Sequence, residues 1–318
     1  MTPTVSVVIP AYRGRSHLET NLPALFAATR AQADVEVIVV DDGSADGTAD
    51  FVAERFPRAR VIALDRNRGF AAACNAGARA SRGDILYFLN TDARVDDGFL
   101  GPVVKRFDDP EVFAVGSREV AAQASRTLVV PVPFFRFGLF GHRYREIPQR
   151  ADPIRLSFVS AGHAAVSRAK FLALGGFDEL YRPFYWEDVD LCYSAWRRGW
   201  RVLLEPASRV EHARQGTIGR FYRPTRIRAI YWKNRFLFVW KNIHDRAWMA
   251  QHFACLPLAL AGHAAVRGPA VLRGFLAALG QAGEAIEKRR ASLGEGGLSD
   301  REIIRSSFPL VEGAREHG

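Results

Sequence analysis

The sequence predicts an α/β fold for most of the 318-residue chain, and three observations support this prediction. Short, almost continuous apolar runs fit strands that are buried on both faces of a mainly parallel sheet. Segments with helical spacing of apolar residues lie between these runs, so strands and helices alternate. Polar residues gather where each run ends, and this is the edge at which open α/β sheets bind ligands.

The first strand is predicted at residues 5–10 and ends in Pro10-Ala11-Tyr12. The following Ser16-His17-Leu18-Glu19 has the form of a capping box, which predicts a helix start. Pro23 predicts either a kink in this helix or a later start. One face of the helix is apolar and consists of Leu18, Leu22 and Leu25.

Three more strands follow, and each ends in polar residues. Residues 35–40 lead into Asp41-Asp42-Gly43-Ser44 and a short helix from about Asp46. Residues 61–64 lead to Asn67-Arg68-Gly69 and a helix of small residues at 70–80. Residues 85–89 end at Asn90-Thr91-Asp92. The chain has neither G-x-G-x-x-G nor a Walker motif, so the layout is of a nucleotide-binding type without the two commonest phosphate loops.

The acidic stretch Glu187-Asp188-Val189-Asp190 follows the aromatic Phe184-Tyr185-Trp186. Val189, Cys192 and Trp196 share one helical face, which places the acids in the first turn of a helix. Backbone N–H groups favour negative charge there, so we expect these carboxylates to stay ionised at neutral pH. Helix capping alone would explain any one of them. Aromatic walls beside the acids favour a sugar or base pocket.

Two regions leave alternatives open. Residues 117–156 combine prolines, phenylalanines and arginines, which fits either a lid or binding segment or an insertion with its own small core. A strand is expected at 157–166, running through Gly162, where the lack of a side chain would permit close approach of acceptor or sugar.

The chain from residue 220 onward changes in composition. The formal net charge is +10, and residues 220–235 hold six basic residues and no acid. The apolar run at 253–261, broken by Pro257, is shorter than the ~20 residues needed to span a bilayer. Basic helices with apolar faces are typical of proteins that lie on a membrane interface. A helical subdomain packed on the core is the alternative.

The three cysteines have no metal-binding spacing and cannot all pair, which fits a reducing compartment. The N-terminus lacks a basic segment, and its apolar run is too short for a signal peptide. These features predict a cytoplasmic protein, and the basic C-terminal region predicts a place at the inner face of the membrane.

The motifs at residues 6–12, 39–48, 67–70 and 88–92, together with Gly175-Gly176-Phe177-Asp178-Glu179 and Trp186-Glu187-Asp188-Val189-Asp190, resemble family 2 inverting glycosyltransferases with the GT-A fold. Six motifs in the family's order make the resemblance specific, and it points to rhamnosyltransferase-like members. It implies a GT-A catalytic domain at 1–219, with a mixed sheet, and a basic and apolar helical extension at 220–318.

The resemblance also implies roles for single residues. Pro10, Ala11 and Tyr12 would hold the nucleotide, and Asp42 would accept the ring N–H of uracil or thymine, which cytosine lacks. Asn67, Arg68 and Asn90 would add donor contacts. Asn90-Thr91-Asp92 replaces the family's D-x-D, so Asp92, completed by His212, would hold Mg²⁺ or Mn²⁺. Asp188 would be the general base, Glu187 would orient the site, and Asp190 would be a surface or structural residue.

The expected function is metal-assisted sugar transfer, with inversion, from a UDP- or dTDP-sugar to a glycan or lipid-linked glycan. A processive polysaccharide synthase would carry a Gln-x-x-Arg-Trp motif and several transmembrane helices. It is disfavoured because Gln215 is followed by Gly216-Thr217-Ile218-Gly219 and because no spanning segment is expected. A basic nucleic-acid-binding module is a further alternative, but no recognised binding motif supports it. An inactive member of the fold with a binding role is the third alternative.

Overall fold

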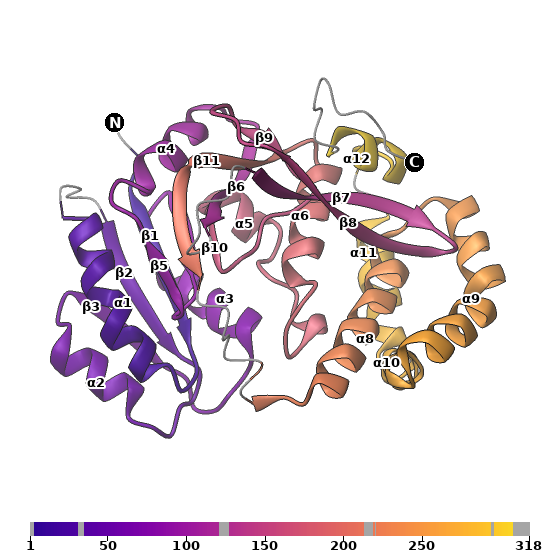
Figure 1. The fold of residues 1–318 in the computed structure, drawn as a ribbon, viewed down its shortest axis with the longest axis horizontal. Coiled ribbons are helices and arrows are strands. Elements are labelled where there is room, and N and C mark those ends of the chain that lie inside the picture. The colour runs from indigo at the N-terminus through magenta and orange to yellow at the C-terminus, as the bar shows by residue number, and fades with distance from the viewer. Residues whose placement is uncertain are drawn as a thin grey trace.

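The computed structural model describes residues 3–30, 35–120, 127–212, 219, 221–293 and 296–307 (Figure 1). The strands are β1 (Val5–Ala11), β2 (Val35–Asp41), β3 (Ala59–Ala63), β4 (Ile85–Leu89), β5 (Ala93–Val95), β6 (Val112–Val120), β7 (Thr127–Arg136), β8 (Leu139–Pro148), β9 (Ile154–Arg155), β10 (His163–Ser167) and β11 (Arg201–His212). The α-helices are α1 (Arg15–Ala28), α2 (Thr48–Arg55), α3 (Phe70–Ala80), α4 (Leu100–Lys105), α5 (Arg168–Ala173), α6 (Glu187–Arg197), α8 (Pro224–Asn242), α9 (Arg246–Arg267), α10 (Ala270–Leu279), α11 (Ala282–Ser292) and α12 (Asp300–Ser306).

The main sheet is mixed and has the strand order β3-β2-β1-β4-β10-β6-β11-β5, with β9 paired to β11. The first four strands in this order are parallel, and β10 runs antiparallel to both β4 and β6. In register, Val5 of β1 lies between Val35 of β2 and Ile85 of β4. The carboxyl ends of β1, β2 and β4 therefore meet at one edge, as the sequence predicts.

Helices cover both faces of this sheet. Alternate residues of β1 face opposite sides: Val7 and Ile9 join a core with α1, α2 and α4, whereas Val8 joins a core with α3, α5, α6 and α8. Residues such as Val7, Val8 and Ile38 are fully buried, which explains the continuous apolar runs of these strands. The α/β prediction is confirmed.

Several local predictions match the structure, whereas the capping box does not. The helix and strand predicted at 70–80 and 85–89 are α3 and β4. Helix α1 begins at Arg15 with Gly14 as its N-cap and no capping side chain, so the capping box at Ser16 is wrong. Pro23 lies inside α1, and the helix therefore does not start later. Leu18, Leu22 and Leu25 form its buried face as predicted.

The strand predicted at 157–166 begins later than expected. Strand β10 starts at His163, and the preceding segment up to Gly162 is irregular. The backbone carbonyl of Gly162 accepts a hydrogen bond from Asn90 N at 2.8 Å, and a Cβ on Gly162 would collide with the Asn90 side chain. This glycine therefore permits close approach of the end of β4. Gly162 also lines the cavity described below, so its closeness to an acceptor or sugar stays a prediction.

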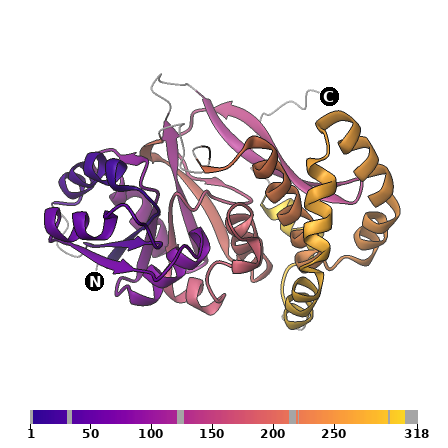
Figure 2. The same ribbon diagram turned by 90° about the horizontal axis from the view of Figure 1, so that it is seen from below.

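The segment 117–156 contains a long hairpin, β7–β8, which reaches across to the C-terminal helices (Figures 1 and 2). The Phe135 and Trp248 rings stack 4.6 Å apart, and Nδ1 of His252 donates to Gly138 O while Nε2 accepts from Trp240. Leu128, Val130 and Phe140 belong to the main core. The hairpin is packed structure and none of its residues lines the cavity described below, whereas Glu119, near the start of the segment, does.

The C-terminal helices pack beside the sheet, with α8 between α6 and the α10–α11 pair (Figure 2). Helix α9 continues through Pro257, so the apolar segment is longer than the run at 253–261 suggests. By length and composition, residues Arg246–Val266 are sufficient to cross a membrane, and only 6% of the most apolar window is buried. The expectation that this region is too short to span a bilayer is wrong, because Pro257, Gly262 and His263 do not end the helix.

Candidate active site

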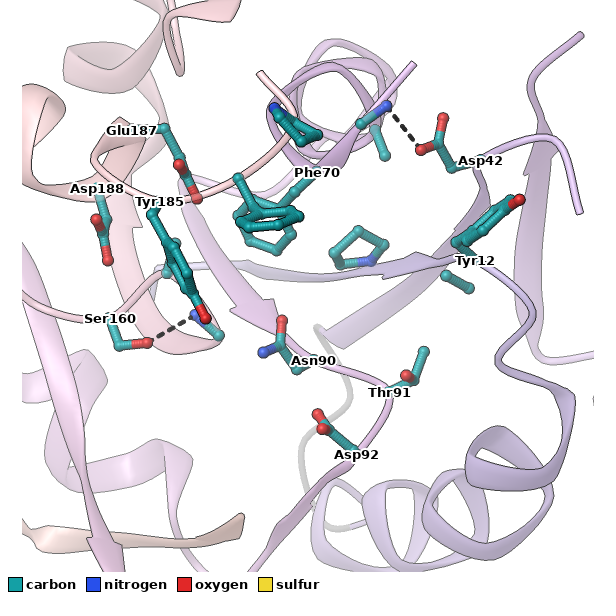
Figure 3. Close-up of a pocket in the computed structure, with 18 of the residues that line it drawn as sticks. Tyr12, Asp42, Phe70, Asn90, Thr91, Asp92, Ser160, Tyr185, Glu187 and Asp188 are labelled. Carbon is teal, nitrogen blue, oxygen red and sulfur yellow. Dashed lines mark hydrogen bonds between the residues drawn. The ribbon is translucent and has the colours of Figure 1, made fainter. Parts of the chain in front are cut away.

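A cavity of about 830 Å³ lies at the carboxyl ends of β1, β2 and β4. Nine of the residues predicted for the site line it, namely Pro10, Ala11, Tyr12, Asp42, Asn67, Asn90, Asp92, Glu187 and Asp188. Figure 3 shows Tyr12 and Asp42 at one end of the cavity, Glu187 and Asp188 at the other, and Asn90 and Asp92 between them. We call these the Asp42 end and the Asp188 end.

Asp42 is fixed at its end by two backbone donors. Its carboxylate accepts from Arg68 N at 2.7 Å and from Gly69 N at 2.8 Å. Gly43, at a φ of 68°, permits this approach, because a Cβ there would collide with the Arg66 backbone. Burial raises the pKa of Asp42, and the two N–H groups oppose that rise. Each carboxylate oxygen keeps a lone pair for a ligand.

The other predicted residues at this end differ in placement. Tyr12 lines the cavity, and its ring meets Phe221 edge-on at 5.8 Å between centroids. Asn67 lines the cavity but is exposed. Arg68 is exposed, and its side chain does not line the cavity; its contribution to the site is the backbone N–H that holds Asp42.

Asp92 is the only carboxylate of Asn90-Thr91-Asp92, and it is 6% exposed. Nδ2 of Asn21, on helix α1, donates to Thr91 O at 2.8 Å, and this hydrogen bond holds the turn against α1. Oxygen atoms of a carboxylate and an amide are the ligands that Mg²⁺ and Mn²⁺ accept. Within the described ranges, no three His, Cys, Asp or Glu side chains form a metal-binding group. The residues present fit a hard cation that takes most of its ligands from a bound diphosphate.

His212 ends β11, and its backbone pairs with Ala93, the residue after Asp92. The pairing places the His212 backbone near the Asp92 turn. The side chain of His212 lies outside the described part of the chain, so its role as a metal ligand stays a prediction.

The Asp188 end is built on an unusual backbone turn. Tyr185 and Trp186 have φ angles of 71° and 78°, which side-chain-bearing residues rarely adopt and which cost about 1–3 kcal/mol each. The turn places Glu187 and Asp188 in the first turn of α6, as predicted, with Phe184 and Tyr185 on the cavity wall. Trp186 instead packs in the core against Phe238.

Glu187 is buried and Asp188 is half-buried, and this burial opposes the expected ionisation of both acids. Burial raises the pKa of Glu187 well above its usual value, and the neighbouring Asp188 raises it further. One Glu187 carboxylate oxygen, Oε2, is buried and has no hydrogen-bond partner within the described ranges. Burial also raises the pKa of Asp188, to about 6, with the backbone N–H groups of Val189, Asp188 and Ala161 opposing the rise. Near pH 7, Asp188 is therefore largely ionised, and Glu187 holds its proton more strongly than an exposed glutamate does.

Asp190 lies behind the cavity in a buried ion-pair network. Its carboxylate accepts from Tyr181 Oη, from Asn242 Nδ2 and from Lys241 Nζ, each at 2.7 Å. Lys241 also pairs with Asp178 at 2.7 Å. Because these partners lie on α8 and the 178–181 turn, Asp190 joins α6 to α8, and its role is structural.

Asn234 of α8 supports the strained turn, and no pattern in the sequence indicates this role. Its Nδ2 lies 2.7 Å from Tyr181 O, 2.9 Å from Phe184 O and 2.8 Å from Tyr185 O. The side chain is fully buried. Asn234 lies some fifty positions from the turn in the chain, so only the packing of α8 brings them together.

The sequence also missed parts of the cavity wall. They come from the loop before β10, from the end of β6 and from the start of α8, and include Glu119, Ser160, Phe221, Tyr222 and Ile227. Gly162 was the one signal for the first of these segments. The aromatic residues among the arginines of 220–235 were a signal for the last.

Residues 6–175, more than half of the chain, match the family model of Glycosyl transferase family 2. The chain belongs to this family. This glycosyltransferase is 28% identical over 311 residues to an N-acetylglucosaminyl-diphospho-decaprenol L-rhamnosyltransferase of Mycobacterium tuberculosis, which covers 87% of this chain and 95% of the relative. It is 31% identical over 245 residues to the succinoglycan biosynthesis protein ExoO of Rhizobium meliloti. This match covers 72% of this chain and 66% of the relative.

Solved structures are similar to this glycosyltransferase in fold. GalNAc-T7 with UDP, GalNAc and Mn²⁺ has a TM-score of 0.64 at 17% identity, covering 92% of this chain and 58% of that one. A mannosyltransferase of Pyrobaculum calidifontis with GDP-Man and Mn²⁺ has a TM-score of 0.56 at 18% identity. The match covers 96% of this chain and 79% of the mannosyltransferase chain. The expected family, GT-A fold and enzymatic class are therefore confirmed.

Proposed function

We propose that this glycosyltransferase moves a sugar from a UDP- or dTDP-sugar to a lipid-linked glycan, with inversion and with the help of a divalent cation. The observation that carries the proposal is the arrangement of one cavity. A fixed carboxylate suited to a pyrimidine lies at one end, and an ionisable acid with a pKa of about 6 lies at the other. The relative that acts on a diphospho-decaprenol supports the lipid-linked acceptor.

At the Asp42 end, a carboxylate oxygen accepts a hydrogen bond from the ring N–H of uracil or thymine. Tyr12 provides an aromatic wall for the base. Cytosine lacks this N–H, so CDP-sugars are disfavoured. At the middle of the cavity, Asp92, together with Asn90 and His212, would hold the cation, which neutralises the diphosphate as it leaves.

At the Asp188 end, the acceptor hydroxyl approaches the anomeric carbon opposite the leaving group. Asp188 takes the hydroxyl proton as the new bond forms, which gives inversion in one displacement. Glu187 orients the acceptor through a hydrogen bond, for which its buried Oε2 is available because it has no partner among the described residues. Burial keeps Asp188 basic enough for this transfer near neutral pH.

A donor panel tests this function. UDP-glucose, UDP-N-acetylglucosamine, dTDP-rhamnose, GDP-mannose and a CDP-sugar are compared by nucleotide release, with Mn²⁺, Mg²⁺ or a chelator. We expect turnover only with uridine or thymidine donors and only with a cation. Asp92→Ala and His212→Ala should each shift the Mn²⁺ titration to higher concentration. Preference for GDP-mannose would contradict the role of Asp42, and full activity in chelator would contradict the metal assignment.

The product of the preferred donor also distinguishes the alternatives. The anomeric configuration of the new linkage, read by NMR, should be opposite to that of the donor, and retention would contradict the single displacement. An inactive binding protein would bind nucleotide without releasing it. A nucleic-acid-binding module would bind oligonucleotides with a steep salt dependence.

We further propose that the C-terminal helices hold the enzyme at the inner face of the cytoplasmic membrane. Phe253 and Leu258 of α9 are 60% and 78% exposed. Lys233 and Arg235 are engaged, by Arg182 O and Phe140 O, so not all of the basic run at 220–235 is available. The exposed Arg223 and Arg226 remain, and basic residues near an anionic surface contribute about 1 kcal/mol each.

Liposome flotation tests the membrane contact. The protein should float with phosphatidylglycerol vesicles at low salt, and Leu258→Glu should reduce flotation. Equal recovery with and without vesicles would leave α9 as a helix of a packed subdomain.

A further inference from the structure

A second, mainly apolar cavity of about 500 Å³ adjoins the active site. It lies where the first turns of α8, the end of α9 and the start of α10 meet. Tyr185 and Ile227 line both cavities, so the second begins where the Asp188 end of the first stops. Its other walls include Arg228, Trp232, Val266 and Ala270. We call it the α8–α10 groove.

Among the residues that the structure describes, Arg228 is the charged residue that lines this groove. Arg228 is exposed and makes no hydrogen bond or ion pair with any part of the chain that the structure describes. The other inward-facing cations of α8 are engaged: Lys233 donates to two oxygen atoms, and Arg235 donates to Phe140 O at 2.6 Å. A free guanidinium on an apolar groove fits a ligand that is apolar and carries a phosphate.

The far end of the groove lies on the exposed apolar helix. Val266, at the end of α9, is 83% exposed, although it lies in a helix that is apolar enough to span a membrane. An apolar chain that leaves the groove at Val266 would therefore pass directly into the lipid surface that α9 contacts. The groove connects the proposed membrane face with the proposed general base.

We propose that the α8–α10 groove binds the first isoprene units of a polyprenyl-diphosphate-linked acceptor, with Arg228 paired to its phosphate. The sugar of the acceptor then passes Tyr185 and brings its hydroxyl to Asp188. This inference rests on the proposed function and specifies the acceptor subsite of the same active site. It predicts that recognition of the lipid and recognition of the donor are separable.

Binding of farnesyl diphosphate to the full chain tests the proposal. The titration follows tryptophan fluorescence, to which Trp232 in the groove contributes, below the micellar concentration and with saturating UDP to block the donor site. Farnesyl diphosphate should bind at least tenfold more tightly than inorganic diphosphate or farnesol. Arg228→Gln should weaken farnesyl diphosphate about tenfold and leave farnesol unchanged, because it removes one charge-assisted contact. Val266→Glu should weaken both.

Matched controls separate the groove from general effects. Arg79→Gln removes an exposed arginine from α3, and Leu258→Glu places the same acid on α9 outside the groove lining. Neither should alter farnesyl diphosphate binding. All four altered residues are exposed, so melting temperatures should be unchanged. Equal weakening by Leu258→Glu and Val266→Glu would mean adsorption to the helix, and it would overturn the proposal.

Other occupants give other results. A loss of dimer mass in light scattering for Val266→Glu, with farnesyl diphosphate binding intact, would assign the groove to a second copy of the chain. Failure of farnesyl diphosphate to bind, while nucleotide release to a soluble glycan persists, would overturn the groove and leave the proposed function standing. Binding in the groove without any nucleotide release would support the groove and contradict the proposed function.

Discussion

The two ends of the active-site cavity are built in different ways. The Asp42 end uses the last residues of parallel strands and the loops that follow them, so its parts are local motifs placed together by the sheet. The Asp188 end depends on a strained turn held by Asn234 of α8, and on walls from β6, the loop before β10 and α8. The Asp42 end belongs to the fold, and the Asp188 end belongs to the tertiary packing of this chain. We therefore expect donor binding and proton transfer to respond to different substitutions.

The largest expected effect separates the two acids of the Asp188 end. Asp188 Oδ1 accepts a hydrogen bond from Val189 N at 2.8 Å. Asp188→Asn keeps an oxygen that can accept this bond, but the amide cannot take a proton from the acceptor hydroxyl. Loss of a general base typically costs ~10²–10⁴-fold in rate, so kcat should fall by that factor. Glu187→Gln should cost less, since a neutral amide still donates a hydrogen bond. Steady-state kinetics with saturating donor measures both, and a near-normal rate for Asp188→Asn would reduce that residue to a helix cap.

The pH profile gives the next effect. The proposed proton transfer requires ionised Asp188, whose pKa is raised to about 6. We expect kcat/KM for the acceptor to be constant above pH 7 and to fall about tenfold per unit below pH 6. Donor affinity should not follow the same curve. A profile that stays flat down to pH 5 would mean that a group other than Asp188 accepts the proton.

A substitution at the Asp42 end should act on the donor alone. In Asp42→Asn, an amide NH₂ group takes the place of one carboxylate oxygen. This group cannot accept a hydrogen bond, either from the pyrimidine N–H or from the backbone N–H of Gly69. We expect donor affinity to fall about tenfold or more, with a smaller change in kcat once donor is saturating. Calorimetric titration with UDP and dTDP measures this, and a circular dichroism melt checks that the loop of Arg68 and Gly69 stays folded. Unchanged affinity would remove Asp42 from donor recognition.

This comparison also explains what the sequence could predict. Strand β4 and helix α3 were predicted with their observed bounds because apolar runs and helical spacing are local properties. The position of α1 was less predictable, since Gly14 rather than Ser16 begins the helix. The length of α9 was hidden by Pro257, which interrupts the apolar run but not the helix.

Residues of the active site follow the same rule. Asp42, Asn90, Asp92, Glu187 and Asp188 lie at ends of elements that the sequence indicates, and each lines the cavity. Asn234 and Glu119 reach the site only through tertiary contacts, and nothing near them in sequence indicates this. The pKa values of Glu187 and Asp188 were also out of reach, because burial by distant segments sets them.

A smaller effect is expected from the support of the strained turn. Asn234→Ala removes the Nδ2 group, whose two hydrogens are shared among three carbonyl oxygens, so the turn should relax and the Asp188 side chain should lose its position. We expect kcat to fall about tenfold with donor affinity unchanged. Asn21→Ala is the matched change at the turn of Asp92, and it should alter donor KM rather than kcat. Equal effects of both variants on donor KM would contradict the separation of the two ends.

The smallest effect is a gain in stability. Because burial raises the folded pKa of Asp188 from 3.8 to about 6, the folded state loses stability as pH rises through this interval. Asp188→Asn has no such loss. The variant should be more stable by about 1–3 kcal/mol at pH 7.5, with the difference vanishing below pH 4. Thermal melts at the two pH values measure it, and a less stable variant at pH 7.5 would mean that the ionised carboxylate stabilises the fold.

The most direct test of the division between the two ends is calorimetric donor affinity set beside turnover, for Asp42→Asn and Asp188→Asn under identical conditions. We predict that Asp188→Asn binds the nucleotide sugar within about twofold of the wild type while turnover falls ~10²–10⁴-fold. Asp42→Asn should lose affinity and keep most of its turnover at saturation. If Asp188→Asn loses donor affinity in proportion to its rate, Asp188 is a donor-binding residue, and the separation of the two ends is wrong.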